Sequence, residues 1–200
     1  DLKLSRGLGD VYKRQTTDCC LKIMVIDKTA VIGFPVDHSL SPAIHNYWIK
    51  KLGLDIKPYE KINVNPNTFE EQINSLKQDG FGGLNVTVPL KEIAFNISDE
   101  TSGVSKKLRS ANTLTLGSDK INGDNTDAAG FINSLDKKTI EETIANKKTL
   151  VLGAGGSARS VVYALNQLGG HVRLFNRTTE KAEILPVSYT HLTLPTTMLV

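Results

Sequence analysis

The stretch Gly153-Ala154-Gly155-Gly156-Ser157-Ala158 has the spacing of a loop that holds the phosphates of a dinucleotide. It follows a short apolar run, residues 149–152, that has the length of a buried parallel strand. Gly153 permits a tight turn off that strand, and Gly155 lets the backbone approach a pyrophosphate because it has no Cβ. Ala158 is small enough for the next helix to pack closely on the strand. The stretch therefore predicts nucleotide binding, the alternative being a glycine-rich turn in another α/β protein.

A helix and a second strand must follow if this loop is to hold phosphate at a helix N-terminus. Apolar residues do recur at spacings of three and four, which places them on one helix face: Ala158, Val161, Val162, Leu165 and Leu168. Gly169-Gly170 ends that helix, and residues 171–175 form a second short strand. The order strand, glycine turn, helix, strand predicts the first half of a dinucleotide-binding unit.

The residues after the second strand indicate which dinucleotide binds. An NAD site has an acidic residue about 20 positions after the glycine turn, where it bonds the ribose 2′-OH. Here position 173 is Arg, and no acidic residue follows until Glu180. The strand ends instead in Asn176-Arg177-Thr178, and Arg177 can make a bidentate, charge-assisted contact with a 2′-phosphate. We predict NADP as the cofactor, the alternative being that Arg177 is a solvated residue at a strand end.

Strands and helices also alternate in the first half of the chain. Strands are expected at 29–32, 56–64 and 82–88, with helices at 41–52 and 65–79 between them. Ser41 is a plausible N-cap of the first helix, and Pro42 fits its first turn. The expected buried faces are Ile44, Tyr47, Trp48 and Leu52 on the first helix, and Phe69, Ile73 and Leu76 on the second. This alternation predicts an α/β domain with a mainly parallel sheet.

The middle of the chain connects this domain to the glycine turn. Residues 91–108 are expected to be mostly helical, and residues 112–122 to form a hairpin that turns at 117–119. A helix carrying Ala128, Phe131, Ile132 and Leu135 follows, and then a polar helical segment at 136–146. We expect the domain boundary near residues 124–127.

The composition is ordinary for a soluble globular chain, with 40% hydrophobic and 22% charged residues. The net charge is +3 without a clustered basic face, so we expect no nucleic-acid partner. No apolar run approaches a membrane helix and no secretory signal is visible, so we expect no membrane partner. The adjacent Cys19 and Cys20 give neither a disulfide framework nor a metal-ligand spacing. We predict a cytoplasmic protein without a metal site.

Several motifs, in one order along the chain, together resemble the shikimate dehydrogenase family. They are GFPVDHSLSPAIHN from Gly33, NVTVPLK from Asn85, SANTL from Ser110, GDNTDAAGF from Gly123, GAGGSARS from Gly153 and NRT from Asn176. Members of this family reversibly reduce 3-dehydroshikimate to shikimate with NADPH, on the route to aromatic amino acids. The resemblance implies a substrate-binding domain at 28–123 and the first half of a Rossmann-type NADP-binding domain at 124–185.

The resemblance also implies a role for individual residues. Ser39 and Ser41 match the pair that binds the substrate carboxylate, and Lys91 matches the catalytic lysine. Asp127 is implied as its catalytic partner. Ring hydroxyls and other substrate groups are assigned to Asn85, Thr87, Asn112 and Asp127. The cofactor contacts are assigned to Gly153, Ala154, Gly155, Gly156, Ser157, Ala158, Asn176, Arg177 and Thr178.

The chemistry of these side chains suits such a substrate. A polyhydroxylated ring acid needs many hydrogen-bond partners, which hydroxyls, amides, a carboxylate and an ammonium provide. Reduction of a ketone needs a hydride and a proton at the carbonyl oxygen. Lys91 can donate that proton while Asp127 holds its ammonium in place. A lysine is useful in this role because partial desolvation shifts its pKa readily.

Local sequence alone leaves other interpretations open. Ser41 could serve only as an N-cap, Asp127 could cap the next helix, and Lys91 could be a solvated residue at a helix start. Asn85 could be a turn residue at a strand edge. His38 and His45 could act in acid–base chemistry, although histidines on a loop and a helix surface are more often structural.

Both ends of the chain depart from the family pattern. Residues 1–27 are expected to be unrelated to the fold or disordered, and residues 186–200 to be unrelated to it. Residues 1 to about 15 and 186–200 resemble translated junction sequence, the alternative being real but variable termini. The family's further strands and its final helix, which carries a glutamine to the substrate, are not found after residue 185. We therefore expect this chain to be a truncated, weakly active or inactive fragment of an enzyme, with a homodimer as the candidate assembly. The alternatives are an NAD-dependent quinate/shikimate dehydrogenase and a non-catalytic nucleotide-binding module.

Overall fold

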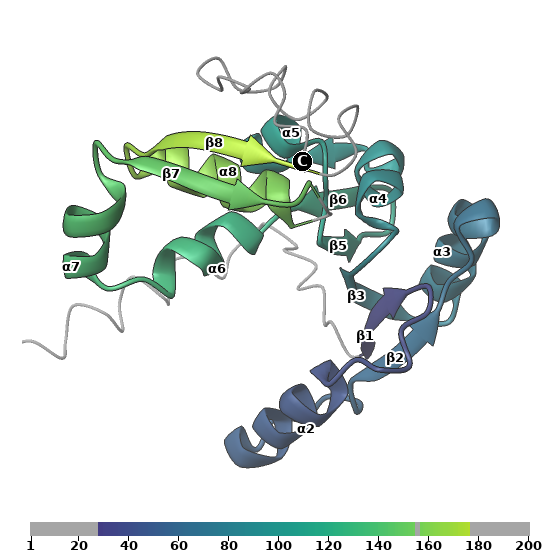
Figure 1. Ribbon diagram of the computed structural model, residues 1–200. Coiled ribbons are helices and arrows are strands. Elements are labelled where there is room, and N and C mark those ends of the chain that lie inside the picture. The colour runs from purple at the N-terminus through teal and green to yellow at the C-terminus, as the bar shows by residue number, and fades with distance from the viewer. Residues whose placement is uncertain (1–27, 155–156, 177–200) are drawn as a thin grey trace, which may run out of the picture.

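A computed structural model describes residues 28–154 and 157–176 (Figure 1). The larger sheet contains β1 (Lys28–Gly33), β2 (Glu60–Asn63), β3 (Phe81–Val86), β4 (Glu100–Thr101), β5 (Thr113–Leu116) and β6 (Ile121–Asp124). The helices between its strands are α2 (Ser41–Leu52), η1 (Pro66–Thr68), α3 (Phe69–Gln78), α4 (Lys91–Ile97) and α5 (Gly103–Leu108). The following part contains α6 (Asp127–Asn133), α7 (Lys137–Thr139), a π-helical turn η2 (Ile140–Ile144), β7 (Lys148–Leu152), α8 (Ala158–Gln167) and β8 (His171–Phe175).

The strand order of the larger sheet is β2-β1-β3-β5-β6-β4, and β7 pairs with β8 in a separate sheet. The pairs β1–β2, β1–β3, β4–β6 and β7–β8 are parallel. The pairs β3–β5 and β5–β6 are antiparallel, and the β5–β6 pair is the predicted hairpin. The predicted α/β class with a mainly parallel sheet is confirmed. The predicted division at residues 123 and 124 stays a prediction, which the two sheets support.

The main core lies on one face of the larger sheet. Ile32 of β1 pairs with Val86 of β3, and both point to the face that α3 and α4 cover. Phe69 and Ile73 of α3 are buried there, as the predicted stripe requires. The buried cluster is Ala30, Ile32, Val64, Phe69, Ile73, Phe81, Leu84, Val86, Leu90, Ala94, Ala111, Leu114, Leu116 and Ile121. Because side chains alternate along a strand, the polar residues of β3 and β5 are left on the opposite face.

Helix α2 packs on the domain with a different face from the one that the sequence predicts. The residues predicted to be buried are exposed: Ile44 by 47%, Tyr47 by 59%, Trp48 by 50% and Leu52 by 67%. Hydrogen bonds between the side chain of Asn46 and the backbone of Tyr59 set the rotation of the helix. At about 100° per residue, Ile44 and Trp48 lie nearly opposite Asn46 and therefore point outward. The apolar contact of α2 with the domain runs through Ile49 instead.

The segment at 91–108 is mostly helical, as predicted, but it consists of two helices separated by β4. The carboxylate of Asp99 accepts a hydrogen bond from the backbone N–H of Ile121 at 2.7 Å, next to the point where β4 joins β6. Ser102 then caps α5 by accepting from the N–H of Ser105. These side-chain contacts to the backbone favour an extended break over a continuous helix. Strand β2 is also shorter than the predicted 56–64.

The second sheet is covered on one face by α6, η2 and α8. Its buried cluster is Ile144, Ala158, Val162, Leu165, Val172 and Leu174. The other face carries Leu150, Leu152 and Phe175, which are exposed by 60%, 74% and 48%. The predicted fully buried strand at 149–152 is therefore wrong for the described residues, because only one helical layer packs on it. A strand buried on both faces needs a layer on each side.

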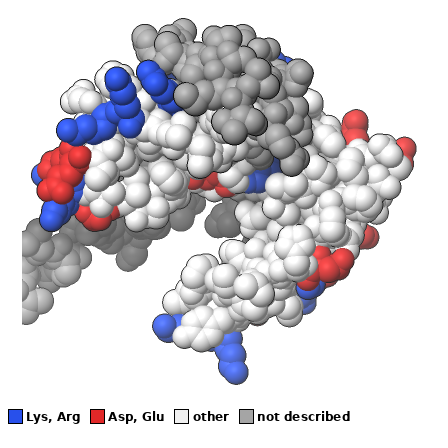
Figure 2. Space-filling view, viewed as in Figure 1, with Lys and Arg blue, Asp and Glu red and all other residues white. Residues whose placement is uncertain are grey.

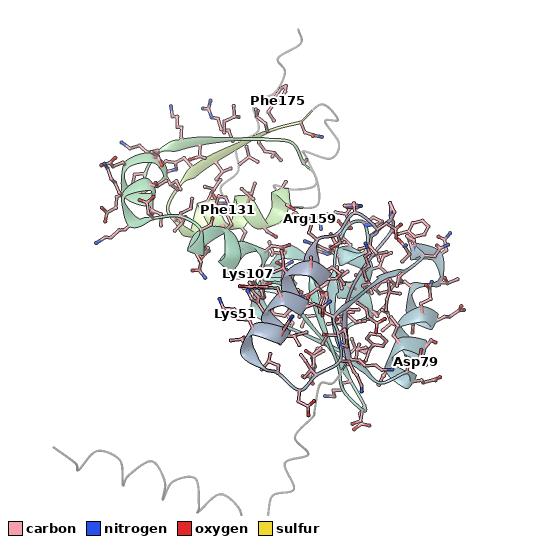
Figure 3. The ribbon with its side chains drawn as sticks, turned by 90° about the horizontal axis from the view of Figure 1, so that it is seen from below. Lys51, Asp79, Lys107, Phe131, Arg159 and Phe175 are labelled. Carbon is pink, nitrogen blue, oxygen red and sulfur yellow. The ribbon has the colours of Figure 1, made fainter. Side chains whose placement is uncertain are left out.

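Helix α8, which packs on the second sheet, also contacts helices α4 and α5 of the larger sheet's domain. Arg159 lies at the start of α8 and points toward the larger sheet's domain (Figure 3). Its guanidinium forms an ion pair with Glu92 of α4 at 2.8 Å and donates to the carbonyl oxygen of Leu108 at 3.4 Å. The ammonium of Lys107 lies 5.7 Å from the ring centre of Tyr163. The start of α8, directly after the glycine turn, therefore lies beside the helix that begins with Lys91.

Candidate active site

Most of the predicted substrate residues follow one edge of the larger sheet. Strands β1 and β3 are parallel, so their carboxyl ends lie side by side, and the N–H of Thr87 donates to the carbonyl of Ile32 at 2.9 Å. The N–H of Val86 donates to the carbonyl of Asn112 at 2.7 Å. Strand β6 ends beside the start of β5 because those strands are antiparallel. The loops after β1, β3 and β6 thus meet at the edge where open α/β sheets bind ligands.

Lys91 and Asp127 form an ion pair at this edge. The Lys91 Nζ lies 2.5 Å from Oδ2 of Asp127, and the two side chains are exposed by only 15% and 26%. Asn112 Nδ2 donates to the other carboxylate oxygen, Oδ1, at 2.8 Å. Because each oxygen of Asp127 accepts from a different residue, the carboxylate is fixed and the ammonium has a defined direction.

The local alternatives for these two residues are wrong. Asp127 is not the N-cap of α6, because Thr126 holds that position and makes no side-chain cap. Lys91 does begin α4, but its side chain is shielded rather than solvated. The ammonium of Lys91 therefore pairs with the carboxylate of Asp127, which also accepts from Asn112, and neither charged group caps its own helix.

A hydrogen-bonded row extends from Asn112 across the polar face of the sheet. Asn112 Oδ1 accepts from the N–H of Thr126 at 3.0 Å and from the hydroxyl of Thr113 at 2.9 Å. Asn85 Nδ2 lies 3.5 Å from the Thr113 oxygen, to which it donates. Asn85 lies inside β3, so the interpretation of this residue as a turn residue is wrong. The structure thus brings Asn85, Asn112, Asp127 and Lys91 together.

The two serines lie on the loop after β1. The hydroxyl of Ser39 donates to Oγ of Ser41 at 3.2 Å, and the N–H of Ser41 donates to Oγ of Ser39 at 3.3 Å. Ser41 is the first residue of α2, whereas the N-cap is Leu40, and no side chain caps the helix. The predicted N-cap role of Ser41 is therefore wrong. Its hydroxyl bonds within the loop and is not used at the helix end.

The loops after β1 and β3 approach closely at Gly33 and Thr87. A Cβ built on Gly33 would lie 2.6 Å from Cγ2 of Thr87. Thr87 is itself partly buried between these loops. A larger residue at position 33 would push apart the loop with the serines and the loop that leads to Lys91.

Figure 2 shows the surface hollowed between the part that carries α2 and the part that carries α6 and β7, with acidic and basic atoms visible inside. The residues that gather at the sheet edge offer hydroxyls, amides, a carboxylate and an ammonium. This set supplies donors and acceptors for a polyhydroxylated anion. Across residues 28–154 and 157–176, no three His, Cys, Asp or Glu side chains are placed to hold a metal ion.

The described part of the glycine turn leaves β7 at Gly153 in a backbone conformation that favours glycine. Gly153 has φ of +101°, which favours glycine, and a Cβ there would meet no atom within 4 Å. Its N–H donates to the carbonyl of Phe175 at 2.7 Å, and the N–H of Ala154 donates to Oδ1 of Asn176 at 3.0 Å. Ser157 precedes α8 and is exposed, whereas Ala158 is buried in the cluster beneath the sheet.

Four predicted cofactor residues lie outside the described residues: Gly155, Gly156, Arg177 and Thr178. Asn176 is described, and its contact with Ala154 ties the end of β8 to the glycine turn. The contact supports a role for Asn176 in shaping the turn, which its sequence position alone did not specify.

The histidines and one tyrosine complete the site's surroundings. His38 is exposed. The ring of His45 stacks on Tyr59 with centres 4.2 Å apart, which supports the structural interpretation of His45. Sequence reasoning missed Tyr59, whose hydroxyl lies 2.7 Å from Oδ1 of Asn85. The only signal in the sequence was an aromatic residue within the strand predicted at 56–64, which is ordinary for a core position.

Comparison with known proteins gives this site a family. Residues 31–114 match the model of the shikimate dehydrogenase substrate binding domain. The NADP(+)-dependent shikimate dehydrogenase of Brucella abortus is 42% identical over 163 residues, which are 81% of this chain and 56% of that protein. The chain belongs to the shikimate dehydrogenase family. A crystal structure of the shikimate dehydrogenase from Aquifex aeolicus superposes with a TM-score of 0.77 and 38% identity, over 85% of this chain and 62% of that one.

A second family structure was determined with ligands bound. The shikimate dehydrogenase of Thermus thermophilus, in complex with NADP(H) and shikimate, has a TM-score of 0.71 and 33% identity. The match covers 84% of this chain and 62% of that chain. This chain thus spans little more than half the length of the curated shikimate dehydrogenases it matches. In the described part of the chain, no helix is both long and apolar enough to cross a membrane.

Proposed function

We propose that the protein carrying this chain interconverts 3-dehydroshikimate and shikimate with NADP(H). The observation that carries the proposal is the Lys91–Asp127 ion pair, fixed by Asn112 at the ligand-binding edge of the sheet. The family membership supports it, because relatives are named as NADP(+)-dependent shikimate dehydrogenases. The bound ligands of the Thermus thermophilus structure support the same substrate and cofactor.

In the proposed reaction, Lys91 donates a proton to the substrate's carbonyl oxygen during reduction and accepts it back during oxidation. Asp127 keeps the ammonium aimed at that oxygen, and Asn112 prevents the carboxylate from rotating. Ser39 and Ser41 bind the carboxylate of the substrate through their hydroxyls, which lie together at the end of β1. Asn85, Thr87 and Asn112 bond the ring hydroxyls. These roles follow the family resemblance and the grouping of the side chains.

The residues present fit a dinucleotide. The open space at Gly153 leaves room for a phosphate, and the start of α8 supplies a positive helix end. We assign the cofactor contacts to the turn from Gly153 to Ala158 and to residues 176–178. NADP supplies a hydride acceptor when it is bound. The Arg159–Glu92 ion pair supports the required proximity, because it holds the start of α8 beside the helix of Lys91.

The proposal is tested with the complete open reading frame that contains this sequence. Purified protein is mixed with shikimate and NADP⁺, and the absorbance of NADPH is followed. We expect turnover with shikimate and NADP⁺ and much slower turnover with NAD⁺ or with quinate. Faster oxidation of quinate with NAD⁺ would favour the quinate/shikimate alternative. Cofactor binding without turnover of either acid would favour a non-catalytic module and overturn the proposal.

Three further predictions accompany this function and have separate measurements. A cytoplasmic location is checked by cell fractionation, and a homodimer by light scattering of the complete protein. The low activity expected for the 200-residue chain is checked by comparing its turnover with that of the complete open reading frame.

A further inference from the structure

Tyr59 lies on the polar face of the sheet, next to the row of site residues. It is only 5% exposed, and its hydroxyl lies 2.7 Å from Oδ1 of Asn85. Its N–H donates to Oδ1 of Asn46 at 2.7 Å, and Nδ2 of Asn46 donates back to its carbonyl at 3.0 Å. The ring stacks on His45 at 4.2 Å with an angle of 15° between the planes. Helix α2 therefore holds Tyr59 by both its backbone and its ring.

The donor and the acceptor of each hydrogen bond in this row can be assigned, because one group at its end can only donate and another can only accept. The N–H of Thr126 can only donate and the carboxylate of Asp127 can only accept, so Asn112 must turn Oδ1 to Thr126 and Nδ2 to Asp127. Oδ1 of Asn112 then requires the hydroxyl of Thr113 to donate. Having used its only proton, Thr113 must accept from Nδ2 of Asn85.

The hydrogen bond between Tyr59 and Asn85 can be assigned in the same way. With Nδ2 of Asn85 directed to Thr113, its Oδ1 faces Tyr59, and the phenol must be the donor. Burial raises the pKa of the Tyr59 phenol above its ordinary value, so the hydroxyl keeps the proton that it donates. The amide of Asn85 has two N–H donors, of which Thr113 uses one. Within residues 28–154 and 157–176 no acceptor bonds the other N–H, so we assign it to a ligand at the sheet edge.

We propose that Tyr59 is a positioning residue for the substrate, which acts by holding the Asn85 amide with its Nδ2 toward Thr113 and the substrate. This inference rests on the proposed function. Without the Tyr59 hydroxyl, the Asn85 amide loses the donor on its oxygen side and turns more freely. Asn85 then presents a donor to the substrate for only part of the time. The proton-transfer pair is separated from Tyr59 by Asn85, Thr113 and Asn112, so its geometry changes little.

The test compares Tyr59→Phe with Tyr47→Phe in the complete protein. Tyr59→Phe keeps the ring on His45 and removes only the hydroxyl. Tyr47→Phe makes the same chemical change on the exposed face of α2, where the side chain is 59% exposed. We expect Tyr59→Phe to raise the KM for shikimate by about 3- to 10-fold, the equivalent of one net hydrogen bond. We expect kcat to stay within about twofold, and the NADP⁺ KM and the Tyr47→Phe control to be unchanged.

A double-mutant cycle shows whether Tyr59 acts through Asn85. Asn85→Asp keeps an acceptor for Tyr59 but removes both N–H donors, so it should raise the shikimate KM at least as much. Adding Tyr59→Phe to Asn85→Asp should then cause no further increase. If Tyr59→Phe proves unstable, an unchanged KM in Asn85→Asp alone would still overturn the inference.

Two outcomes contradict a positioning role directly. One is a Tyr59→Phe protein with a lower melting temperature but an unchanged shikimate KM, which would make Tyr59 purely structural. The other is an additive effect in the cycle, which would make it independent of Asn85. Both outcomes are judged by comparison with the unsubstituted protein, which must itself oxidise shikimate. Absence of shikimate oxidation in that protein would instead contradict the proposed function.

Discussion

Replacing Asp127 by Asn removes one charge from the site while nearly preserving its shape. In the structure, Oδ2 of Asp127 accepts from Lys91 at 2.5 Å and Oδ1 accepts from Asn112 at 2.8 Å. An amide at position 127 has a single oxygen, so it can satisfy only one of these donors and turns its own N–H₂ toward the other. The loss of one hydrogen bond to a charged group corresponds to about 1.5–3 kcal/mol, or roughly 10- to 100-fold in kcat/KM. The decrease in kcat/KM is measured from the steady-state oxidation of shikimate by NADP⁺.

The exposed ion pair of Lys120 and Glu100 provides a matched control. Both side chains are 60% exposed, and Glu100→Gln makes the same change from carboxylate to amide beside a lysine. Exposed pairs of this kind contribute little, so we expect unchanged kinetics. The reasoning is refuted if Asp127→Asn keeps a kcat/KM within about twofold of the unsubstituted protein. It is also refuted if Glu100→Gln lowers kcat/KM as much, because the effect would then not belong to the site.

Three other predictions concern substrate binding, cofactor choice and alkaline stability. Replacing both Ser39 and Ser41 by Ala should raise the shikimate KM and leave NADP⁺ affinity nearly unchanged; an unchanged shikimate KM would place the substrate carboxylate elsewhere. Arg177→Ala should weaken NADP⁺ by about 10- to 100-fold but NAD⁺ little, since a charge-assisted contact contributes about 1.5–3 kcal/mol; an affinity ratio within about threefold of the parent's would contradict the NADP assignment. Burial raises the pKa of Tyr59, so its neutral phenol contributes stability that is present below the unfolded-state pKa of about 10 and is lost as pH rises above it. Urea unfolding from neutral to alkaline pH should therefore show a smaller loss of unfolding free energy in Tyr59→Phe than in the unsubstituted protein. Equal losses would contradict this.

The sequence was sufficient for the features that depend on local spacing. The hairpin of β5 and β6 follows from its turn at Gly117, whose N–H donates to the carbonyl of Lys120 at 2.9 Å. The stripe of Phe69 and Ile73 matched the helix period and is buried. Alternation of strands and helices correctly indicated the α/β class. The group around Lys91 was indicated by family motifs, because nothing in the local sequence links residues 91 and 127.

The sequence was insufficient where a polar contact decided the orientation of an element. The apolar residues of α2 predicted a buried face at Trp48, but the bonds of Asn46 to the backbone of Tyr59 rotate that face outward. Tyr59 was missed for a related reason. Its partner Asn85 is 26 positions away, and only the pairing of β1 with both β2 and β3 brings them together. Long-range pairs of this kind leave no periodic signal.

The measurement that tests the central claim most directly is the shikimate-oxidising activity of Lys91→Ala in the complete protein. A lysine that transfers the proton should lower kcat by about 10²- to 10⁴-fold when it is removed. The shikimate KM should change far less, because the serines, Asn85 and Asn112 remain to bind the substrate. A kcat near that of the unsubstituted protein would contradict the account and would leave the Lys91–Asp127 pair with a structural role only.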